Sequence, residues 1–386
     1  MPDRIKFAVN ARPLLKPITG ISRYLWRLMR EVERSGRFAP RYFYSTHWGG
    51  ELDQAPGRLL SPKLMRLAGL LRSFDPLIRS FERHRFSSGL RRRDYAFYFE
   101  PNYVPFPTEL PTVVTIHDLS HLRHPETHPR KRVRQLERDL PAAIDRAACI
   151  LTPSEFTRRE VIDVFDVSPE RVVATPLGVE ARFSPQTRDA TTELLNPLEL
   201  THGRYFLAVG TLEPRKNILT TLEAHSRLPQ RVRAAYPLVV AGMRGWRTGT
   251  LSQQLDAARS RGDVRLLGHV DDQQLPLLYA GAVMLSYPSI YEGFGLPALE
   301  AMASGVPVAA SNRASLPEVV GNAGILLEPC DVSGLTSAML GIIEDPAFAA
   351  DLKARGLEQA RSFTWERCAS LTMRSWEDAA RESSLR

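Results

Sequence analysis

Two acidic residues, Glu292 and Glu300, stand eight positions apart around a glycine-containing turn. The apolar run at 283–288 predicts a buried strand before the turn. Residues 297–303 predict a helix after it, with a proline in the first helical turn, where proline is tolerated. At 1.5 Å per helical residue the two carboxylates are about 12 Å apart, wider than the ~5–9.5 Å that separates the two carboxylates of a glycosidase. The spacing favours two contacts along one long ligand.

The turn itself suits a phosphate. Gly293 and Gly295 let the main chain approach a ligand closely, and the amino end of the following helix offers free N–H groups and a favourable dipole. A nucleotide sugar fits this arrangement, with Glu292 on sugar hydroxyls and Glu300 on ribose hydroxyls. The alternative is a purely structural turn followed by a solvated Glu300. The residues expected to bind the ligand are Glu292, Gly293, Phe294, Gly295, Leu296 and Glu300.

Two adjacent cations, Arg215 and Lys216, come after a second predicted strand at 205–209 and a turn at Gly210. Arginine presents a planar fork of donors and lysine a point charge, and both suit a diphosphate at the carboxyl end of a strand. The alternative is an ordinary solvated surface pair. If the strand lies in the same sheet as 283–288, these cations and the glycine turn serve one ligand.

His117 ends the apolar strand 112–117 and therefore occupies a site position, where Asp118 orients it or caps the next segment of the chain. Four histidines could instead form a metal site: His117, His121, His124 and His128. Pro125 and Pro129 interrupt their helical spacing, and no cysteine or carboxylate pattern completes the site. We therefore expect no metal.

Short β-branched runs alternate with helical patterns along the whole chain, which predicts parallel sheets covered by helices on both faces. The pattern restarts after 183–204, so two doubly wound α/β domains follow one another, with a cleft between them. The expected boundaries are 1–184, a linker at 185–203, a second domain at 204–365, and a C-terminal helix at 366–386 that packs back toward the first domain. The expected strands lie at 6–10, 41–45, 95–99, 112–117, 149–153, 171–176, 205–209, 238–241, 264–267, 283–288, 307–311 and 324–327.

The composition of the 386 residues, with 43% hydrophobic and 24% charged residues, excludes disordered, collagen-like and disulfide-stapled chains. No apolar run approaches the ~18 residues that span a bilayer. The apolar stretch at the amino end is too short for a signal peptide. Three scattered cysteines, an odd number, indicate reduced thiols. We expect a cytoplasmic protein.

Positive charge is concentrated at the start of the chain. Residues 1–100 contain 20 Lys and Arg but only 9 Asp and Glu. Within 58–93 there are ten basic residues, and the only acidic ones are Asp75 and Glu82. Leucines and phenylalanines interleave with them in a basic amphipathic pattern, which suits peripheral contact with the inner face of a membrane or a solvated basic helix face. We expect no nucleic-acid partner, because no nucleic-acid motif accompanies the charge.

Glu292-x7-Glu300 within EGFGLPALEAMASGVPV resembles the signature of glycosyltransferase family 4, retaining enzymes of the GT-B fold with two Rossmann-like domains. Further segments match that family in order along nearly the whole chain: Thr19–Tyr24, His117-Asp118, Thr152–Ser154, Pro176–Val179, Gly210–Asn217 (GTLEPRKN), Gly268–Val270 and Phe363–Trp365. The resemblance is most specific in the second half.

The resemblance implies roles for the candidate residues. Arg215 and Lys216 neutralise the leaving nucleoside diphosphate, Gly20 lets the first domain touch that diphosphate, and His117 lies beside the sugar and the acceptor. Two departures stand out, because many relatives have an arginine where this chain has Thr211 and more than one glycine near Gly20. Transfer in the family needs neither a covalent enzyme intermediate nor a metal cofactor.

The GTLEPRKN and YEGFGLP versions of the motifs resemble bacterial mannosyl- and rhamnosyltransferases of surface polysaccharide synthesis, including O-antigen lipopolysaccharide. The implied reaction moves a hexose, mannose or a deoxyhexose, from a GDP-linked donor to a glycan or polyprenyl-diphosphate-linked acceptor. The alternatives are a sugar-nucleotide epimerase, a phosphorylase, or a non-catalytic scaffold. A nicotinamide-dependent dehydrogenase is disfavoured because no GxGxxG follows either first strand.

Overall fold

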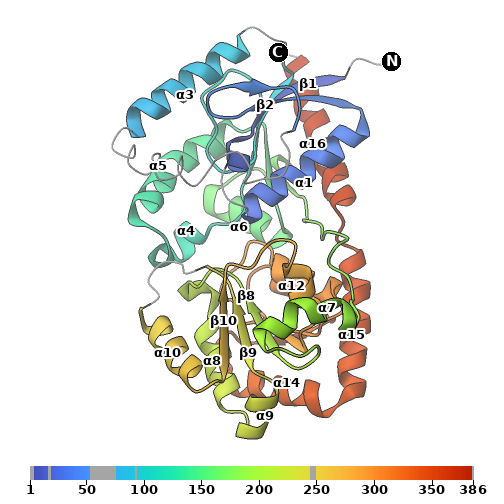
Figure 1. Ribbon diagram of the computed structural model, residues 1–386. Helices are drawn as coiled ribbons and strands as arrows, with labels where there is room; N and C mark the ends of the chain where they lie inside the picture. The colour runs from blue at the N-terminus through green and yellow to red at the C-terminus, as the bar shows by residue number, and fades with distance from the viewer. Residues whose placement is uncertain (1–3, 16–18, 53–74, 92–93, 244–248, 385–386) are drawn as a thin grey trace. The chain divides into compact units, whose positions relative to one another are not determined.

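The computed structural model describes residues 4–15, 19–52, 75–91, 94–243 and 249–384 and forms two compact units. Unit 1 comprises residues 1–119, 134–178 and 365–386, and unit 2 comprises residues 120–133 and 179–364. Each unit is a layered α/β structure built on one sheet (Figure 1). The predicted fold class, two doubly wound parallel-sheet domains, is confirmed.

Sheet A of unit 1 has seven described strands in the order β3-β2-β1-β4-β5-β6-β7. All neighbours pair in parallel except β3, which is antiparallel to β2. The strands are β1 (Ile5–Asn10), β2 (Phe38–Phe43), β3 (Trp48–Gly49), β4 (Phe97–Glu100), β5 (Thr112–Thr115), β6 (Cys149–Thr152) and β7 (Val172–Ala174). The helices of this half of the fold are α1 (Gly20–Ser35), α3 (Asp75–Leu90), α5 (Arg130–Arg146), α6 (Glu155–Phe165) and α16 (Trp365–Ser384).

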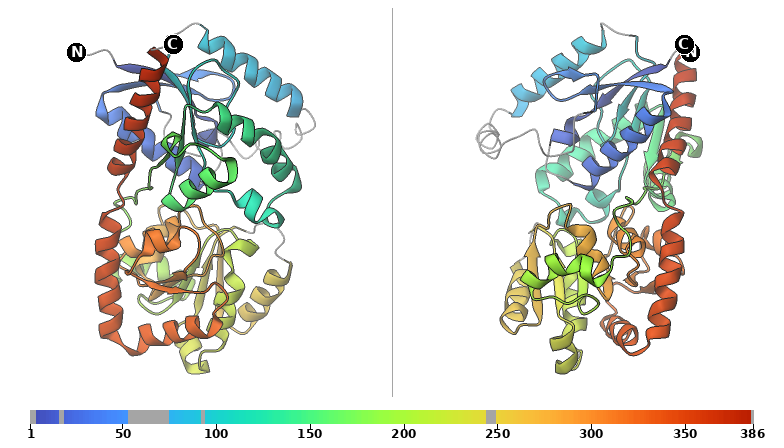
Figure 2. Two further views of the ribbon diagram at one scale, coloured as in Figure 1. Left: turned by 180° about the vertical axis from the view of Figure 1, so that it is seen from behind. Right: turned by 45° about the vertical axis from the view of Figure 1, so that its right-hand side comes forward.

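Alternation along β4 shows how helices cover both faces of sheet A. Phe97 and Phe99 pack against Trp376 of α16 in tilted arrangements, with ring centroids 5.6 and 4.9 Å away. Tyr98, which points to the opposite face, packs on Phe86 of α3 at 4.8 Å. Helix α16 also runs alongside α1 (Figure 2), so the last twenty described residues complete the core that the first strands begin.

Sheet B of unit 2 has six described strands, all parallel, in the order β10-β9-β8-β11-β12-β13. They are β8 (Phe206–Val209), β9 (Leu238–Ala241), β10 (Val264–Gly268), β11 (Met284–Tyr287), β12 (Val308–Ser311) and β13 (Ile325–Leu327). The helices are α4 (Ser120–Arg123), α7 (Arg188–Leu195), α8 (Ile218–Ser226), α9 (Gln230–Ala235), α10 (Gly249–Ser260), α11 (Leu275–Ala280), α12 (Leu296–Ala303), α13 (Leu316–Val320), α14 (Val332–Glu344) and α15 (Pro346–Arg361).

Both sheets reverse their winding direction in the middle. In sheet A the chain starts at β1, runs outward to β2 and β3, and then crosses to β4; in sheet B it starts at β8, runs to β9 and β10, and crosses to β11. Ligands of open α/β sheets bind beyond the carboxyl ends of the strands at such switch points. The residues that come after β1 and β4, and those that come after β8 and β11, are therefore in the two positions best suited to bind ligands.

Every predicted strand is present, with bounds shifted by up to three residues, while the two-residue β3 had no signal in the sequence. The segment 185–203, which the sequence suggests is a linker, contains helix α7 and belongs to unit 2. Helix α7 is eight residues long and buries only Thr191 and Leu195, so it produces no apolar period in the sequence.

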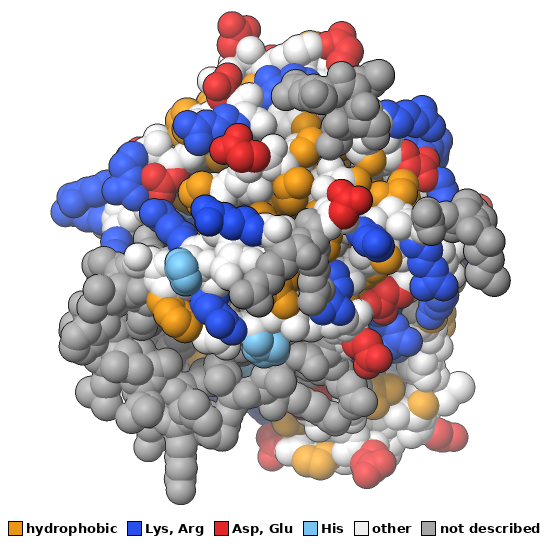
Figure 3. Space-filling view, turned by 90° about the horizontal axis from the view of Figure 1, so that it is seen from above, with side chains coloured by type: hydrophobic (Ala, Val, Ile, Leu, Met, Phe, Trp, Pro, Cys, Tyr) orange, Lys and Arg blue, Asp and Glu red, His pale blue; other side chains and the backbone are white. Residues whose placement is uncertain are grey.

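The predicted basic amphipathic stretch 58–93 lies largely outside the described residues, apart from 75–91 with helix α3, and membrane contact through it stays a prediction. On the face drawn in Figure 3, the Asp and Glu side chains of the described residues lie among the Lys and Arg side chains. No helix in the described ranges combines the length and apolar character needed to cross a membrane.

Candidate functional site

Two loops meet at the switch point of sheet B. One comes after β8 and contains the short helix Pro214–Lys216, and the other comes after β11 and leads into α12. The Ile290 N–H donates to the Arg215 carbonyl at 2.8 Å, and the Asn217 side-chain amide donates to the Pro288 carbonyl at 3.1 Å. These bonds hold the cations of the first loop against the acidic residue of the second.

Glu292 receives both cations on its carboxylate. Lys216 Nζ lies 2.5 Å from Glu292 Oε1, and Arg215 Nη1 lies 3.2 Å from Oε2. Tyr287, the last residue of β11, donates its hydroxyl to Oε1 at 2.7 Å. The structure therefore brings together three of the predicted site residues in a single charged cluster.

A second carboxylate completes this cluster. Glu213 Oε1 lies 2.6 Å from Arg215 Nη2, so two carboxylates balance two cations. The four charged side chains are only 9–13% exposed, and burial at this level makes an unbalanced charge costly. Among the described residues, Lys216 Nζ has Glu292 and Tyr287 as hydrogen-bond partners. An ammonium has three N–H groups, which leaves one for a ligand.

Burial and the two cations act in opposite directions on Glu292. Burial raises the pKa of its carboxyl, but the charges of Lys216 and Arg215, together with the hydrogen bonds from Lys216 and Tyr287, lower it more, so that the pKa is about 2. Burial, together with the negative charge of Glu292, raises the pKa of Tyr287 well above its usual value. At neutral pH the carboxylate is therefore ionised and the tyrosine keeps its proton, as the hydrogen bond between them requires.

The glycine turn leads into α12 as the sequence predicts. Gly295 has φ +109° and no side chain caps the helix there. Ser315 donates to the carbonyls of Glu292 and Phe294 at 2.9 and 2.7 Å, which fixes the turn. Glu300 lies within α12 and is 4% exposed, so the alternative of a solvated Glu300 is wrong.

Gly242 controls the position of the β8 loop. A Cβ atom at Gly242 would lie 1.8 Å from the main-chain oxygen of Gly210, and the φ of +158° also disfavours a side chain. The Lys216 stem passes 3.5 Å from where a Gly210 Cβ would be. We expect Gly242→Ala to lower turnover roughly 100-fold by moving Lys216, and to cost about 1–3 kcal/mol in urea unfolding.

A matched control is Gly341→Ala in helix α14, where the nearest atom to an added Cβ is 4.0 Å away. This variant should keep full turnover and full stability. Equal turnover of the two variants would show that the Gly210–Gly242 contact does not position the cluster.

Three further predicted residues belong to unit 1. His117 Nε2 lies 2.8 Å from the Pro101 carbonyl, and Asp118 Oδ1 accepts a hydrogen bond from the Tyr103 hydroxyl at 3.0 Å. Gly20 opens α1, and an added Cβ there would meet no atom within 4 Å. The described protein atoms thus impose no need for glycine at position 20, and its predicted contact with a diphosphate stays a prediction.

The histidine-rich segment is not arranged around a common centre. His128 Nε2 lies 2.8 Å from Ser120 Oγ, and the His124 ring packs on Tyr291 with centroids 5.4 Å apart. In the described ranges no three His, Cys, Asp or Glu side chains are grouped so that they could hold a metal ion.

Sequence reasoning did not identify two residues of the cluster, Glu213 and Tyr287, or Ser315, which supports the glycine turn. Glu213 stands two positions before Arg215 in the EPRK run, and Tyr287 ends the strand before the glycine turn. Both positions agree with the expectation that functional groups gather at strand carboxyl ends. Ser315 comes from a different loop, and no local pattern identifies it.

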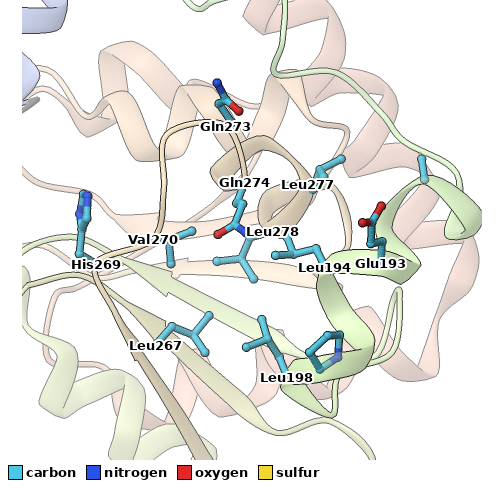
Figure 4. Close-up of a pocket in the computed structure, with 12 residues that line it drawn as sticks. Glu193, Leu194, Leu198, Leu267, His269, Val270, Gln273, Gln274, Leu277 and Leu278 are labelled. Carbon is cyan, nitrogen blue, oxygen red and sulfur yellow. The ribbon is translucent and has the colours of Figure 1, made fainter. Parts of the chain in front are cut away.

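Unit 2 also contains a separate cavity of about 570 Å³ between helix α7 and the segment that leads from β10 into α11. Figure 4 shows Leu194, Leu267 and Leu277 among the apolar side chains that line it, with Gln273, Gln274 and Glu193 as polar members. His269 and Val270 of the predicted motif also lie there. None of the charged cluster residues lines this cavity, so the cavity and the cluster are distinct features of unit 2.

Family models identify both halves of the chain. Residues 18–183 match "Glycosyltransferase Family 4" and residues 193–359 match "Glycosyl transferases group 1". The chain is 37% identical over 380 residues to O-antigen chain mannosyltransferase B of Escherichia coli, covering 97% of this chain and 100% of that protein. It is 32% identical over 270 residues to the E. coli serotype-specific mannosyltransferase WbdA, covering 68% of this chain and 33% of that one.

Among solved structures, Alr3699/HepE of Anabaena, crystallised with UDP and glucose, has a TM-score of 0.74 at 16% identity, with 97% of this chain and 100% of that one covered. At this identity the similarity concerns the fold alone. The family expected from the motifs is confirmed by the two family models and by the E. coli O-antigen chain mannosyltransferase B, which aligns over 97% of this chain. The chain belongs to glycosyltransferase family 4 and is a glycosyltransferase of the GT-B fold.

Proposed function

We propose that this glycosyltransferase moves mannose from GDP-mannose to a lipid-linked glycan acceptor, with retention of anomeric configuration and without a metal ion. The mannosyltransferase names of two relatives support the sugar and the glycan acceptor. The observation that carries the proposal is the cluster of Glu292, Arg215 and Lys216 at the switch point of sheet B.

The cluster is suited to a leaving nucleoside diphosphate. Lys216 has an N–H group to offer, and the amino end of α12 carries no side-chain cap. Positive charge and main-chain donors held in place before the reaction stabilise the charge that develops on a leaving phosphate. Glu292 holds both cations in position and presents its remaining acceptor capacity to sugar hydroxyls.

Retention results if the acceptor attacks from the face that the phosphate leaves. The acceptor oxygen bonds to the anomeric carbon, the bond from that carbon to the phosphate oxygen breaks, and the acceptor proton passes to the departing phosphate. No protein nucleophile is needed. In this scheme His117 and Asp118 of unit 1 bind sugar or acceptor hydroxyls, and the cations replace a metal ion in offsetting the diphosphate charge.

Calorimetric titration with GDP, UDP and ADP tests the donor nucleotide. We expect GDP to bind at least about tenfold more tightly than the others, a difference of roughly 1.4 kcal/mol. With GDP-α-mannose, proton NMR should show an α-linked product, and EDTA should leave the rate unchanged.

Tighter binding of UDP, in line with the ligand of HepE, would contradict the GDP assignment. A β-linked product would contradict retention, and loss of activity in EDTA would contradict metal independence. Release of free sugar without transfer would point to the epimerase-type alternative.

A further inference from the structure

The switch point of sheet A also contains a buried glutamate. Glu100 ends β4 and is 1% exposed. Its Oε2 accepts hydrogen bonds from Asn10 Nδ2 at the end of β1 and from the Tyr98 hydroxyl, each at 2.7 Å. Its Oε1 accepts from the Asn102 N–H at 3.1 Å. The carboxylate therefore joins the two central strands to the first residues of the loop after β4.

That loop contacts both predicted site residues of unit 1. The Pro101 carbonyl lies 2.8 Å from His117 Nε2, and because a carbonyl oxygen can only accept, Nε2 is the nitrogen that bears the proton. The Tyr103 hydroxyl donates to Asp118 Oδ1 at 3.0 Å. Two residues that come after β5 are thus held by the turn 101–103 that comes directly after β4.

The main chain of the turn 101–103 is strained, and hydrogen bonds on both sides hold it in place. Tyr103 has φ +65°, a left-handed conformation that is rare for a bulky residue. Its N–H is fixed by the Thr115 carbonyl at 3.1 Å on one side, and Glu100 fixes the preceding Asn102 on the other. Such strain persists where the surroundings hold it firmly, as these bonds do.

We propose that Glu100 and Tyr103 are positioning residues of the transferase: Glu100 anchors the turn 101–103, and the turn sets the orientations of His117 and Asp118. The inference rests on the proposed roles of His117 and Asp118 in binding sugar or acceptor. Neither Glu100 nor Tyr103 needs to touch the substrate for this function.

The chemistry of Glu100 suggests the test. Three donors converge on its two oxygens, and a glutamine side chain can place an oxygen at only one of those sites. With the oxygen kept where Asn10 and Tyr98 converge, the amide nitrogen would face the Asn102 N–H, and the anchor would be lost. Burial raises the pKa of Glu100 to about 7 despite these bonds, so assays belong above about pH 8, where the carboxylate is ionised.

We expect Glu100→Gln to lower kcat roughly 10- to 100-fold through misplacement of His117 and Asp118, with the Kd for GDP unchanged. The nitrogen-15 signals of the His117 ring, assigned with His117→Gln, should show loss of the fixed Nε2–H form. The matched control is Glu33→Gln, which removes a carboxylate on α1 that also accepts from a strand tyrosine, Tyr42, and should change neither readout.

Full kcat in Glu100→Gln, or unchanged His117 signals at any kcat, would overturn the proposal. If Glu100→Gln does not fold, Tyr103→Phe keeps the ring and removes the hydroxyl that donates to Asp118; it should lower kcat and leave GDP binding intact, and full kcat would overturn the proposal. Failure of the proposed function can be told apart from failure of this inference. If the proposed function is wrong, the wild-type protein transfers no sugar, but its His117 nitrogen-15 signals still show whether the Nε2–H form is fixed.

Discussion

Lys216→Met is expected to lower the rate of sugar transfer roughly 1000-fold and to weaken GDP binding clearly, because it removes a preorganised positive charge from the departing diphosphate. Methionine keeps most of the length of the stem that lies along Gly210, so packing is largely retained. Steady-state kinetics and calorimetric titration with GDP measure the two effects.

A control for this substitution is Lys353→Met on α15, where the lysine is exposed and is not a partner in the ion pairs of the charged cluster. That variant should bind GDP and transfer sugar as the wild-type protein does. Unchanged GDP affinity in Lys216→Met would show that the lysine serves only as the counter-ion of Glu292.

Glu292→Gln is expected to abolish measurable transfer and to destabilise the protein by roughly 3–5 kcal/mol, because it leaves Arg215 and Lys216 buried with one carboxylate between them. Urea unfolding at pH 7 measures the loss. The double variant with Lys216→Met should recover part of the stability, since it removes one of the unbalanced charges.

The acid dependence of stability gives a second measurement on Glu292. Its pKa is about 2 in the folded protein, below the ordinary value of a glutamate, so the folded state binds this proton less readily than the unfolded state does. The stabilisation is present above about pH 4.5 and is lost as the pH falls toward 2. Glu292→Gln should show a shallower loss of stability below pH 4.5, and an identical slope would contradict the ion-paired state.

Much of the fold can be predicted from the sequence, because parallel strands buried on both faces are short continuous apolar runs, whereas the helices between them repeat their apolar residues every three to four positions. Strands such as 238–241 and 264–267 were located to within a residue. The sequence does not predict helix α7, because its eight residues bury too few side chains to give an apolar period. It does not predict β3 either, because two residues form no pattern. Tertiary pairing decides such short elements.

The sequence predicts which residues belong to the candidate site better than it predicts the contacts between them. Residue types and strand ends located Glu292, Arg215 and Lys216, but the sequence suggested that the carboxylate and the cations would each bind the ligand. That they pair with one another, and that Glu213 balances the second charge, depends on the adjacency of β8 and β11. No local signal encodes which strands become neighbours across a switch point.

A crystal structure of the complex with GDP tests the central claim most directly. Oxygen atoms of the β-phosphate should lie about 2.7–3.2 Å from Lys216 Nζ and from a main-chain nitrogen at the start of α12. Glu292 should still bridge the two cations. A diphosphate bound elsewhere, with no contact to Lys216, Arg215 or the amino end of α12, would contradict the assignment of this cluster to the donor.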